Sequence, residues 1–346
     1  MNGHGGELTL AALAGYGVRE MFTLSGGHIF PFYDAAVKGE TRIYDVRHEQ
    51  TATFAAEGLA KLTRRPGVAV LTAGPGITNG VSAITTAHFN GSPLVVLGGR
   101  APQARWGAGS LQELDHVPIV SSITKLAATV TATADIPKLV NDAVAAALAP
   151  HRGPVFLDFP LDVVFASADA DVPEPVVQRG PAPDPDEVAK AAALIAGAER
   201  PVLFAGSDVW WDGAEEALRE CVEELRVPTF VNGLGRGTLP ADHELAFSRT
   251  RGLTKSDADV VVERSFSNKP KKTGKFENFS DKIESYVSII SGPAIERFAA
   301  NPLTYRSVES GEADPIFKVQ DTLTSRAQIG DLNAGFATEV VAVLGL

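Results

Sequence analysis

Three short stretches near the start of the chain hold the side chains best suited to chemistry. The stretch SGGH ends at His28, the stretch RHE ends at Glu49, and the glycine-rich stretch GPGITNG covers residues 74–80. Each follows an apolar run typical of a strand, and open α/β sheets bind ligands outside the carboxyl ends of their strands. The three stretches therefore predict one site that combines a carboxyl group, an imidazole and a turn whose backbone a ligand can approach.

Each stretch also has a plain structural interpretation. A glutamate in the first turn of a helix complements the helix dipole, so Glu49 alone predicts no more than a stable helix start. His28 by itself is typical of a surface or capping residue, and the turn at 74–80 departs from the dinucleotide-binding G-x-G-x-x-G spacing. The functional interpretation depends on the combination, because the three stretches follow successive predicted strands and would line one edge of one sheet.

The elements that must position these residues alternate between strand-like and helix-like patterns. In the first 165 residues, apolar runs such as VAVLTAG alternate with helical segments such as EQTATFAAEGLAKLT, which covers residues 49–63. A continuous apolar run is typical of a parallel strand covered on both faces. The pattern restarts after residue 187, so the sequence predicts an α/β fold class, with two doubly wound parallel-sheet domains.

Composition predicts the domain boundary. Residues 168–187 hold five prolines and several acidic residues, which predicts an extended linker between domains at 1–167 and 188–346. After residue 263 the sequence becomes polar, lysine-rich and divergent. Within that part we expect a strand over residues 285–290 and a helix over residues 330–344.

Charge and cysteine content exclude several classes. The net charge of the 346-residue chain is −11, which argues against a nucleic-acid partner because phosphate binding needs a basic face. The single cysteine, Cys221, rules out an intrachain disulfide and is expected to be a small buried residue. No apolar run approaches the roughly 18 residues that a membrane span needs, and no basic region precedes an apolar one as in a signal peptide. We therefore expect a cytoplasmic protein with no membrane partner.

Further motifs give the sequence a family resemblance. Gly26-Gly27 is followed by Glu49 after Arg47-His48, and TAGPGITNGVSAITTAHFNGSPLVVLGG begins at Thr72. The stretches LQE, SITK and HRGPVFLDFPLDV follow in that order. Together they resemble the thiamine diphosphate (ThDP) enzymes of the acetolactate synthase group, specifically over residues 1–165 and more loosely to residue 262. The resemblance implies a pyrimidine-binding domain followed by a central domain.

The resemblance implies a role for each candidate site residue. Glu49 would activate the cofactor by sharing a proton with a nitrogen of its pyrimidine ring, which requires a sheltered, apolar setting. Gly26 and Gly27 would place backbone groups near the aminopyrimidine or the reacting carbonyl, and Gln112 would face the substrate. The residues implied to lie along the pyrimidine pocket are Pro75, Gly76 and Asn79.

Two departures leave the substrate open. Acetolactate synthases have a small residue at the position of His28, whereas GGHI resembles benzaldehyde lyase, in which the histidine takes part in proton transfer to the substrate. Leu111 stands where acetolactate synthases usually carry an aromatic residue. The resemblance thus implies either conversion of two pyruvate molecules to 2-acetolactate and CO2, or an acyloin lyase or carboligase reaction. The expected substrate is a small 2-oxo acid or an acyloin.

The resemblance also implies a missing part. The third domain of the family holds Mg²⁺ and the cofactor's diphosphate with a Gly-Asp-Gly stretch, and no Gly-Asp-Gly occurs in this sequence. We expect no metal ligands in the chain itself, and a diphosphate-binding domain supplied from outside it. Sites of this family lie between subunits, so either a homo-oligomer or a partner carrying that domain is implied. A non-catalytic, regulatory homologue is the alternative.

The central domain leaves its ligand open. In this family it binds FAD in some members, ADP in others and no nucleotide in several, so FAD and ADP both stay candidates. Trp210 and Trp211 would either stack on a flat ligand or pack at a domain seam.

Overall fold

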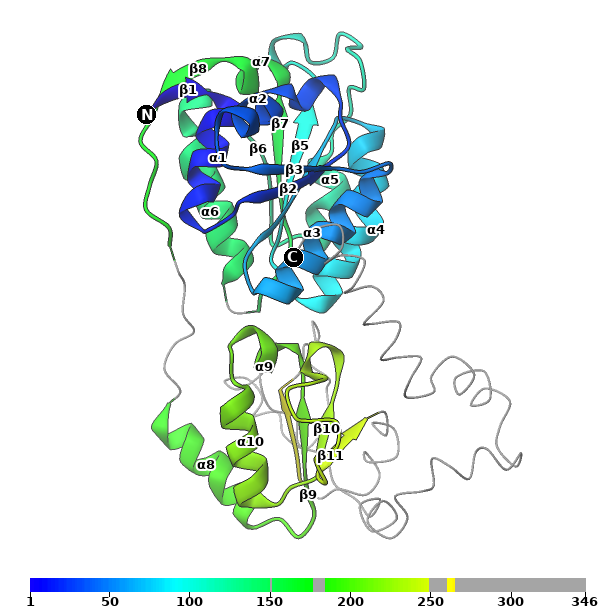
Figure 1. The fold of residues 1–346 in the computed structure, drawn as a ribbon, viewed down its shortest axis with the longest axis vertical. Coiled ribbons are helices and arrows are strands. Elements are labelled where there is room, and N and C mark those ends of the chain that lie inside the picture. The colour runs from blue at the N-terminus through cyan, green and yellow to red at the C-terminus, as the bar shows by residue number, and fades with distance from the viewer. Residues whose placement is uncertain (150, 177–183, 249–259, 265–346) are drawn as a thin grey trace, which may run out of the picture. The chain divides into compact units, whose positions relative to one another are not determined.

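The computed structural model describes residues 1–149, 151–176, 184–248 and 260–264, which fall into two units divided between residues 181 and 182 (Figure 1). Each unit is built on a parallel sheet with helices, which confirms the predicted α/β class. The strand predicted over 285–290 and the helix predicted over 330–344 lie outside the described residues, as does the middle of the predicted linker.

A six-stranded parallel sheet forms the centre of the first unit, in the order β3-β2-β4-β5-β7-β6. The chain passes from β2 to β3 on one side and then places β4 on the other side of β2. Such a reversal of strand order opens a crevice at the carboxyl ends of the strands. The strands are β2 (Glu20–Thr23), β3 (Arg42–Asp45), β4 (Gly67–Leu71), β5 (Leu94–Arg100), β6 (Leu126–Thr129) and β7 (Val155–Pro160).

Helices cover both faces of this sheet (Figure 1). One layer contains α1, α2 and α6, and the other contains α3 and α4, which pack against each other. The strands β4 and β5 between the layers are almost completely buried. The helices are α1 (Gly5–Gly15), α2 (Phe30–Lys38), α3 (Glu49–Thr63), α4 (Pro75–Asn90), α5 (Val117–Val120), α6 (Ile136–Leu148) and α7 (Leu161–Phe165).

Local sequence explains where the two site helices begin. The helix predicted over residues 49–63 coincides with α3, and Nδ1 of His48 caps it by accepting the Gln50 backbone N–H at 3.1 Å. Helix α4 begins at Pro75, whose ring presets the helical φ, directly after Gly74. Gly74 has φ +61° and ψ −115°, a conformation that favours glycine.

A small sheet at the edge of the first unit was not predicted. Strand β1 (Asn2–His4) pairs antiparallel with β8 (Ser167–Asp169), so the start of the predicted linker belongs to the first unit. Strands of three residues carry too few positions for an alternating apolar pattern, which is why periodicity does not reveal them.

The second unit contains a four-stranded parallel sheet in the order β11-β10-β9-β12. Its first helix begins within the segment predicted as linker, because Asp184 caps it and Pro185 starts it. Among the helices of the described residues, none joins the length and apolar character that crossing a bilayer needs. The elements are α8 (Pro185–Ala196), β9 (Pro201–Ala205), α9 (Ser207–Trp211), α10 (Glu215–Leu225), β10 (Thr229–Val231), β11 (Ala246–Ser248) and β12 (Val260–Arg264).

Candidate functional site

Glu49 lies at the carboxyl edge of the first sheet, as the first residue of α3. Its side chain is buried, with 8% of its surface exposed. Oε2 accepts a hydrogen bond at 2.9 Å from Nδ2 of Asn79, which α4 carries in its second turn. Within the part of the chain that the structure describes, no group donates a hydrogen bond to Oε1. One half of a sheltered carboxyl group therefore stays open to a ligand.

Thr72, directly after β4, is the residue around which the glycine turns close. A Cβ on Gly26 would lie 2.3 Å from Thr72 Oγ1, and a Cβ on Gly76 would lie 2.7 Å from Thr72 Cγ2. Both positions thus need glycine for close packing on the threonine. The added Gly76 Cβ would also stand 3.7 Å from Oε1 of Glu49. The absence of that side chain keeps the open oxygen uncovered.

His28 lies next to this group, in the short 3-10 helix Gly27–Ile29 after β2. Its side chain is buried, and its Nδ1 is 3.5 Å from Thr72 Oγ1. Burial is the main reason that the pKa of His28 is lowered below its usual value, and a hydrogen bond to the Leu111 backbone partly opposes this. The imidazole is therefore neutral at pH 7 and able to accept a proton.

Gln112 reaches the same edge on the loop over residues 101–116. Its φ of +56° puts a non-glycine residue in the left-handed region, and such residues concentrate at functional sites. A Cβ on Gly74 would come within 3.0 Å of Gln112 Cβ, so the loop rests directly on the glycine turn. The Glu113 carboxylate holds the loop by accepting two of its backbone N–H groups at 2.9 and 3.1 Å.

A buried network behind the site was not assigned by the sequence. The Gly74 backbone N–H donates to Nε2 of His116 at 2.9 Å, and Nδ1 of His116 lies 3.0 Å from Oδ1 of Asp158. Nη1 of Arg100 lies 2.7 Å from Oδ2 of Asp158, so the fully buried carboxylate is paired with a cation. One signal was present: Asp158 is the one charged residue in the otherwise apolar strand β7. A charge in a strand covered on both faces demands a partner.

The structure thus brings most of the predicted site residues to one place. Glu49 and Asn79 are hydrogen-bonded, Gly26 and Gly76 both pack on Thr72, and the loop carrying Gln112 lies on Gly74. A Cβ on Gly27 would meet no atom within 4 Å, so open space adjoins the turn. Pro75 is exposed at the start of α4, where its role in starting the helix accounts for it. The catalytic and binding roles of these residues stay predictions.

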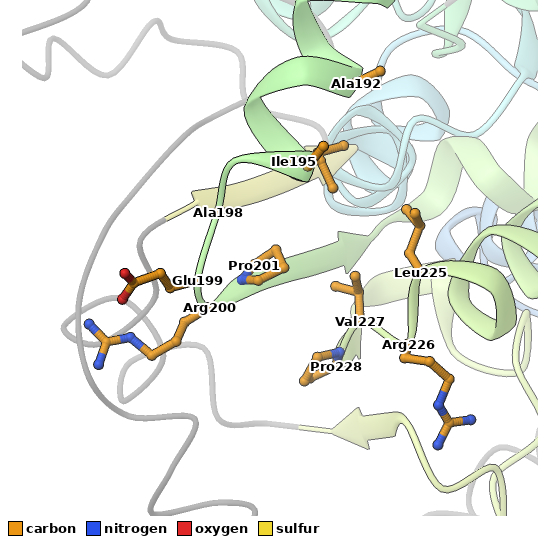
Figure 2. Close-up of a pocket in the computed structure, with 11 residues that line it drawn as sticks. Ala192, Ile195, Ala198, Glu199, Arg200, Pro201, Leu225, Arg226, Val227 and Pro228 are labelled. Carbon is orange, nitrogen blue, oxygen red and sulfur yellow. The ribbon is translucent and has the colours of Figure 1, made fainter.

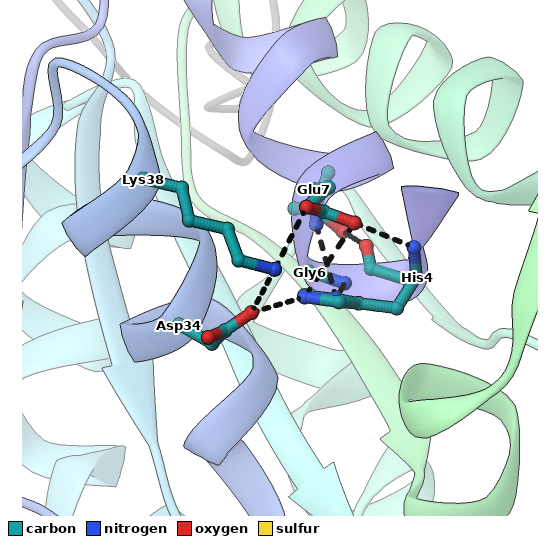
Figure 3. Close-up of polar contacts among 7 residues, drawn as sticks. His4, Gly6, Glu7, Asp34 and Lys38 are labelled. Atoms are coloured by element: carbon teal, nitrogen blue, oxygen red, sulfur yellow. Dashed lines mark hydrogen bonds and ion pairs between the residues drawn. The ribbon is translucent and has the colours of Figure 1, made fainter. Parts of the chain in front are cut away.

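A second polar cluster surrounds the start of α1, and Figure 3 shows Lys38 pointing into it. In the described residues, His4, Glu7 and Asp34 are the carboxylates and imidazole close enough together to share a metal ion. Nζ of Lys38 lies 2.7 Å from Asp34 and 3.2 Å from Glu7, so an ammonium group already supplies the positive charge. Glu7 also accepts the His4 backbone N–H at 2.9 Å, which makes the cluster a capping box for α1.

The second unit has a hollow of about 630 Å³, shown in Figure 2. It is lined mainly by apolar residues between the end of α8 and the amino ends of β9 and β10. Ligands of open sheets bind at the opposite, carboxyl edge, so this hollow gives no support for a nucleotide. Arg226 on its rim pairs with Glu244 at 2.6 Å.

At the carboxyl edge of that second sheet, the glycine turn is filled by its neighbours. A Cβ on Gly235 would lie 2.3 Å from the Ala205 carbonyl oxygen, and a Cβ on Gly233 would lie 2.9 Å from Ser207 Oγ. Close packing of the two loops accounts for both glycines. Trp211 is buried, which favours packing over stacking on a ligand for that residue.

Comparisons with known proteins identify the families that the two units match. A family model described as "Thiamine pyrophosphate enzyme, N-terminal TPP binding domain" matches residues 3–119. The model of the "Thiamine pyrophosphate enzyme, central domain" matches residues 188–264. A further model, described as a domain of unknown function, matches residues 243–322.

Individual relatives support the same relationship. The chain is 50% identical over 262 residues to an acetolactate synthase large subunit of Mycobacterium tuberculosis. The matched region covers 75% of this chain and 48% of the relative. It is 34% identical over 296 residues to 2-hydroxyacyl-CoA lyase 2 of Homo sapiens, covering 75% of this chain and 47% of that one. A probable acetolactate synthase large subunit of Methanococcus aeolicus is 33% identical over 291 residues, 80% of this chain and 49% of the relative. The chain spans about half the length of the curated relatives it matches.

Proposed function

Residues 3–119 and 188–264 belong to the thiamine pyrophosphate enzyme family as its N-terminal and central domains, and from this premise we propose that the chain supplies the pyrimidine side of an enzyme that makes or breaks carbon–carbon bonds. The observation that carries the proposal is the Glu49 carboxyl group. It is buried, one oxygen is held by Asn79, and the other is open.

We infer that the surroundings of Glu49 suit the aminopyrimidine of ThDP. A ring nitrogen that bears or shares a proton needs an acceptor in a sheltered setting, and Oε1 of Glu49 offers one. The missing side chain of Gly76 leaves space beside that oxygen, and the missing side chain of Gly27 leaves open space at the turn. When bound, the cofactor supplies the carbon that attacks a carbonyl group and takes up the negative charge.

The chain's own residues orient groups and move protons. Asn79 fixes Oε2 of Glu49, so that Oε1 presents its lone pairs in one direction and can hold or pass on the shared proton. His28, neutral at pH 7, can accept a proton from a substrate hydroxyl or return it. The Gln112 amide on the facing loop can donate to a substrate carbonyl oxygen.

The reaction that we propose first is the conversion of two pyruvate molecules to 2-acetolactate and CO2. Its support is the 50% identity with a mycobacterial protein named acetolactate synthase. An acyloin or 2-hydroxyacyl lyase reaction is the second candidate, favoured by His28 and by the relatives named lyases. For either reaction, Mg²⁺ and the diphosphate would be bound by a diphosphate-binding domain supplied from outside this sequence.

The test combines the full chain with the separately produced diphosphate-binding domain of a full-length relative, ThDP and Mg²⁺. Pyruvate is supplied in one assay, and benzoin and a 2-hydroxyacyl-CoA in two others. We expect turnover with one substrate class, lost on Glu49→Gln and kept in the matched control Glu57→Gln. Turnover that is equal in wild type and Glu49→Gln would refute the role of Glu49.

A non-catalytic regulatory role makes a different prediction. Such a chain would associate with full-length relatives without completing a site, and the combined sample would then show no turnover with any substrate. Calorimetry with the chain alone separates the cases further. Because the proposed pocket holds only the pyrimidine end, we expect ThDP to bind with a Kd above about 1 mM, worth less than about 4 kcal/mol.

A further inference from the structure

The network behind the Glu49 site joins two elements that carry site residues. His116 ends the loop that bears Gln112, and its Nε2 accepts the backbone N–H of Gly74 at 2.9 Å. Gly74 is the residue before α4, which bears Gly76 and Asn79. His116 is fully buried. This one bond therefore fastens the substrate-side loop to the helix that orients Glu49.

The hydrogen-bond pattern defines the state of the His116 ring. Because the Gly74 N–H donates to it, Nε2 must present a lone pair. Nδ1 lies 3.0 and 3.1 Å from the two oxygens of Asp158, and a carboxylate only accepts, so Nδ1 bears the proton. Nη1 of Arg100 lies 2.7 Å from Oδ2 of Asp158 and pairs with its negative charge. The carboxylate therefore does not require a positive charge on the imidazole.

The two nitrogens of His116 thus have separate tasks. Nδ1 anchors the ring to the central strand β7 through Asp158. Nε2 sets the position of Gly74, whose unusual backbone angles begin α4. Through α4 it sets Asn79, which holds the carboxyl group of Glu49 at 2.9 Å.

We propose that His116 is a positioning residue that fixes the two walls of the pyrimidine site relative to each other through its neutral Nδ1–H tautomer. It makes no contact with the reacting groups itself. The structural part of this inference stands on the buried network alone, while its consequence for ligand binding rests on the proposed function.

The test uses two substitutions, each of which replaces the hydrogen-bonding group of one ring nitrogen of His116. The amide of His116→Asn occupies the place of Nδ1 and can donate to Asp158, but it cannot reach Gly74. The amide oxygen of His116→Gln occupies the place of Nε2 and can accept from Gly74. Amide hydrogen exchange of the full chain reports Gly74 and the first turn of α4, with the core strand β5 as internal reference.

We expect exchange at Gly74 about tenfold faster in His116→Asn, the effect of one lost hydrogen bond, and within about threefold of wild type in His116→Gln. Thiamine, which has the aminopyrimidine but no diphosphate, should bind about fivefold more weakly to the Asn variant and about as in wild type to the Gln variant. A role in core packing alone predicts equal changes in both variants, and that result would overturn the proposal.

A measurement on the wild-type chain needs no variant to fold. Nitrogen-15 spectra of the His116 imidazole should show a protonated Nδ1 and a bare Nε2 at pH 7. A protonated Nε2 would overturn the proposal. If thiamine binds the wild-type chain too weakly for the variants to be compared, as a Kd far above about 1 mM would make it, the exchange and nitrogen-15 results decide the role of His116 on their own, and the proposed function is tested separately by turnover.

Discussion

Glu49 and Glu57 lie on the same helix, α3, and both are almost fully buried, at 8% and 3% exposure. Oε1 of Glu57 has three partners: Lys61 Nζ at 2.7 Å, Asn90 Nδ2 at 2.8 Å and Ser92 Oγ at 3.0 Å. Among the residues that the structure describes, Glu49 has one side-chain partner, the amide of Asn79 on Oε2. The two carboxyl groups therefore lie on the same helix and are similarly buried, but they differ in the number of hydrogen-bond and ion-pair partners.

The difference matches the one expected between a structural carboxylate and the ligand-binding carboxylate that we propose. Burial of a charged group costs free energy unless partners replace its water, and Glu57 has a cation and two neutral donors. Its bonds tie α3 to the end of α4 and the turn before β5. Glu49 leaves Oε1 without such a donor among the described residues, which is the arrangement expected where a ligand completes the site.

The largest expected difference is in activity. In the chain combined with a diphosphate-binding domain, ThDP and Mg²⁺, Glu49→Gln should lower the turnover rate by about 10²–10⁴-fold, the usual contribution of a positioned acid or base. Glu57→Gln has the same chemistry eight residues later and should change the rate by less than about threefold. Steady-state rates of both variants check this. Equal losses of turnover in the two variants would mean that the number of hydrogen-bond partners does not distinguish the functions of the two carboxylates.

Stability should show the reverse order. Glu57→Gln removes a buried negative charge that pairs with Lys61 and accepts two neutral hydrogen bonds, and it should lower the free energy of unfolding by about 1–3 kcal/mol. Glu49→Gln can still accept the Asn79 amide and should change stability by less than about 1 kcal/mol. Urea unfolding, followed by a signal from the first unit, measures both. A larger loss in Glu49→Gln than in Glu57→Gln would contradict the comparison.

Gly76→Ala tests the packing beside the open oxygen of Glu49 without changing the glutamate. Gly76→Ala brings a Cβ to 2.7 Å from Thr72 Cγ2, a crowding cost that should outweigh the roughly 1 kcal/mol that alanine gains over glycine in a helix. In a Thr72→Ser background the nearest remaining atoms are at 3.5 and 3.7 Å, so the same change should stabilise the chain. Unfolding free energies of the wild type, the two single variants and the double variant give the sign of the Gly76→Ala effect in each background. A destabilising effect of similar size in both backgrounds would show that Thr72 is not the obstacle.

The smallest expected effect extends the comparison from carboxylates to two imidazoles. Burial lowers the pKa of His28 at the site, and burial together with Lys125 and His88 lowers that of His151, before β7, to about 4. Both groups bind a proton more weakly in the folded chain than at the unfolded pKa of about 6.5, so stability falls as pH drops below that value.

Replacement of either histidine by glutamine should therefore reduce the loss of stability between pH 7.5 and 5. His151→Gln should act over a window that reaches down to about pH 4, the pKa of that group. Unfolding measured at both pH values checks this. A wild-type chain that becomes more stable on acidification would contradict the direction assigned to both groups.

The sequence predicted the parts of this site that depend on local pattern. Apolar periodicity and glycine turns placed His28, Glu49 and the turn at 74–80 at the ends of parallel strands, and the α/β class and the family resemblance are confirmed. The start of α3 at Glu49 was predicted because a helical pattern begins there without interruption.

The parts of the site that depend on residues far apart in the sequence could not be predicted from local pattern. Gly74, His116 and Asp158 are separated by 42 residues at each step, and only the adjacency of β5 and β7 brings Arg100 to the carboxylate. The difference between Glu49 and Glu57 likewise rests on which side chains of α4 and the following turn face α3. Helical periodicity does not show which side chains of a neighbouring helix lie against either glutamate.

We propose that Glu49, with its open oxygen, moves the proton that activates the cofactor. The most direct measurement is the hydrogen–deuterium exchange rate of the thiazolium C2 proton of ThDP, in the chain combined with a diphosphate-binding domain. We predict fast exchange in wild type and in Glu57→Gln, and exchange at the rate of free ThDP in Glu49→Gln. Exchange in Glu49→Gln as fast as in wild type would contradict the claim, whatever the substrate proves to be.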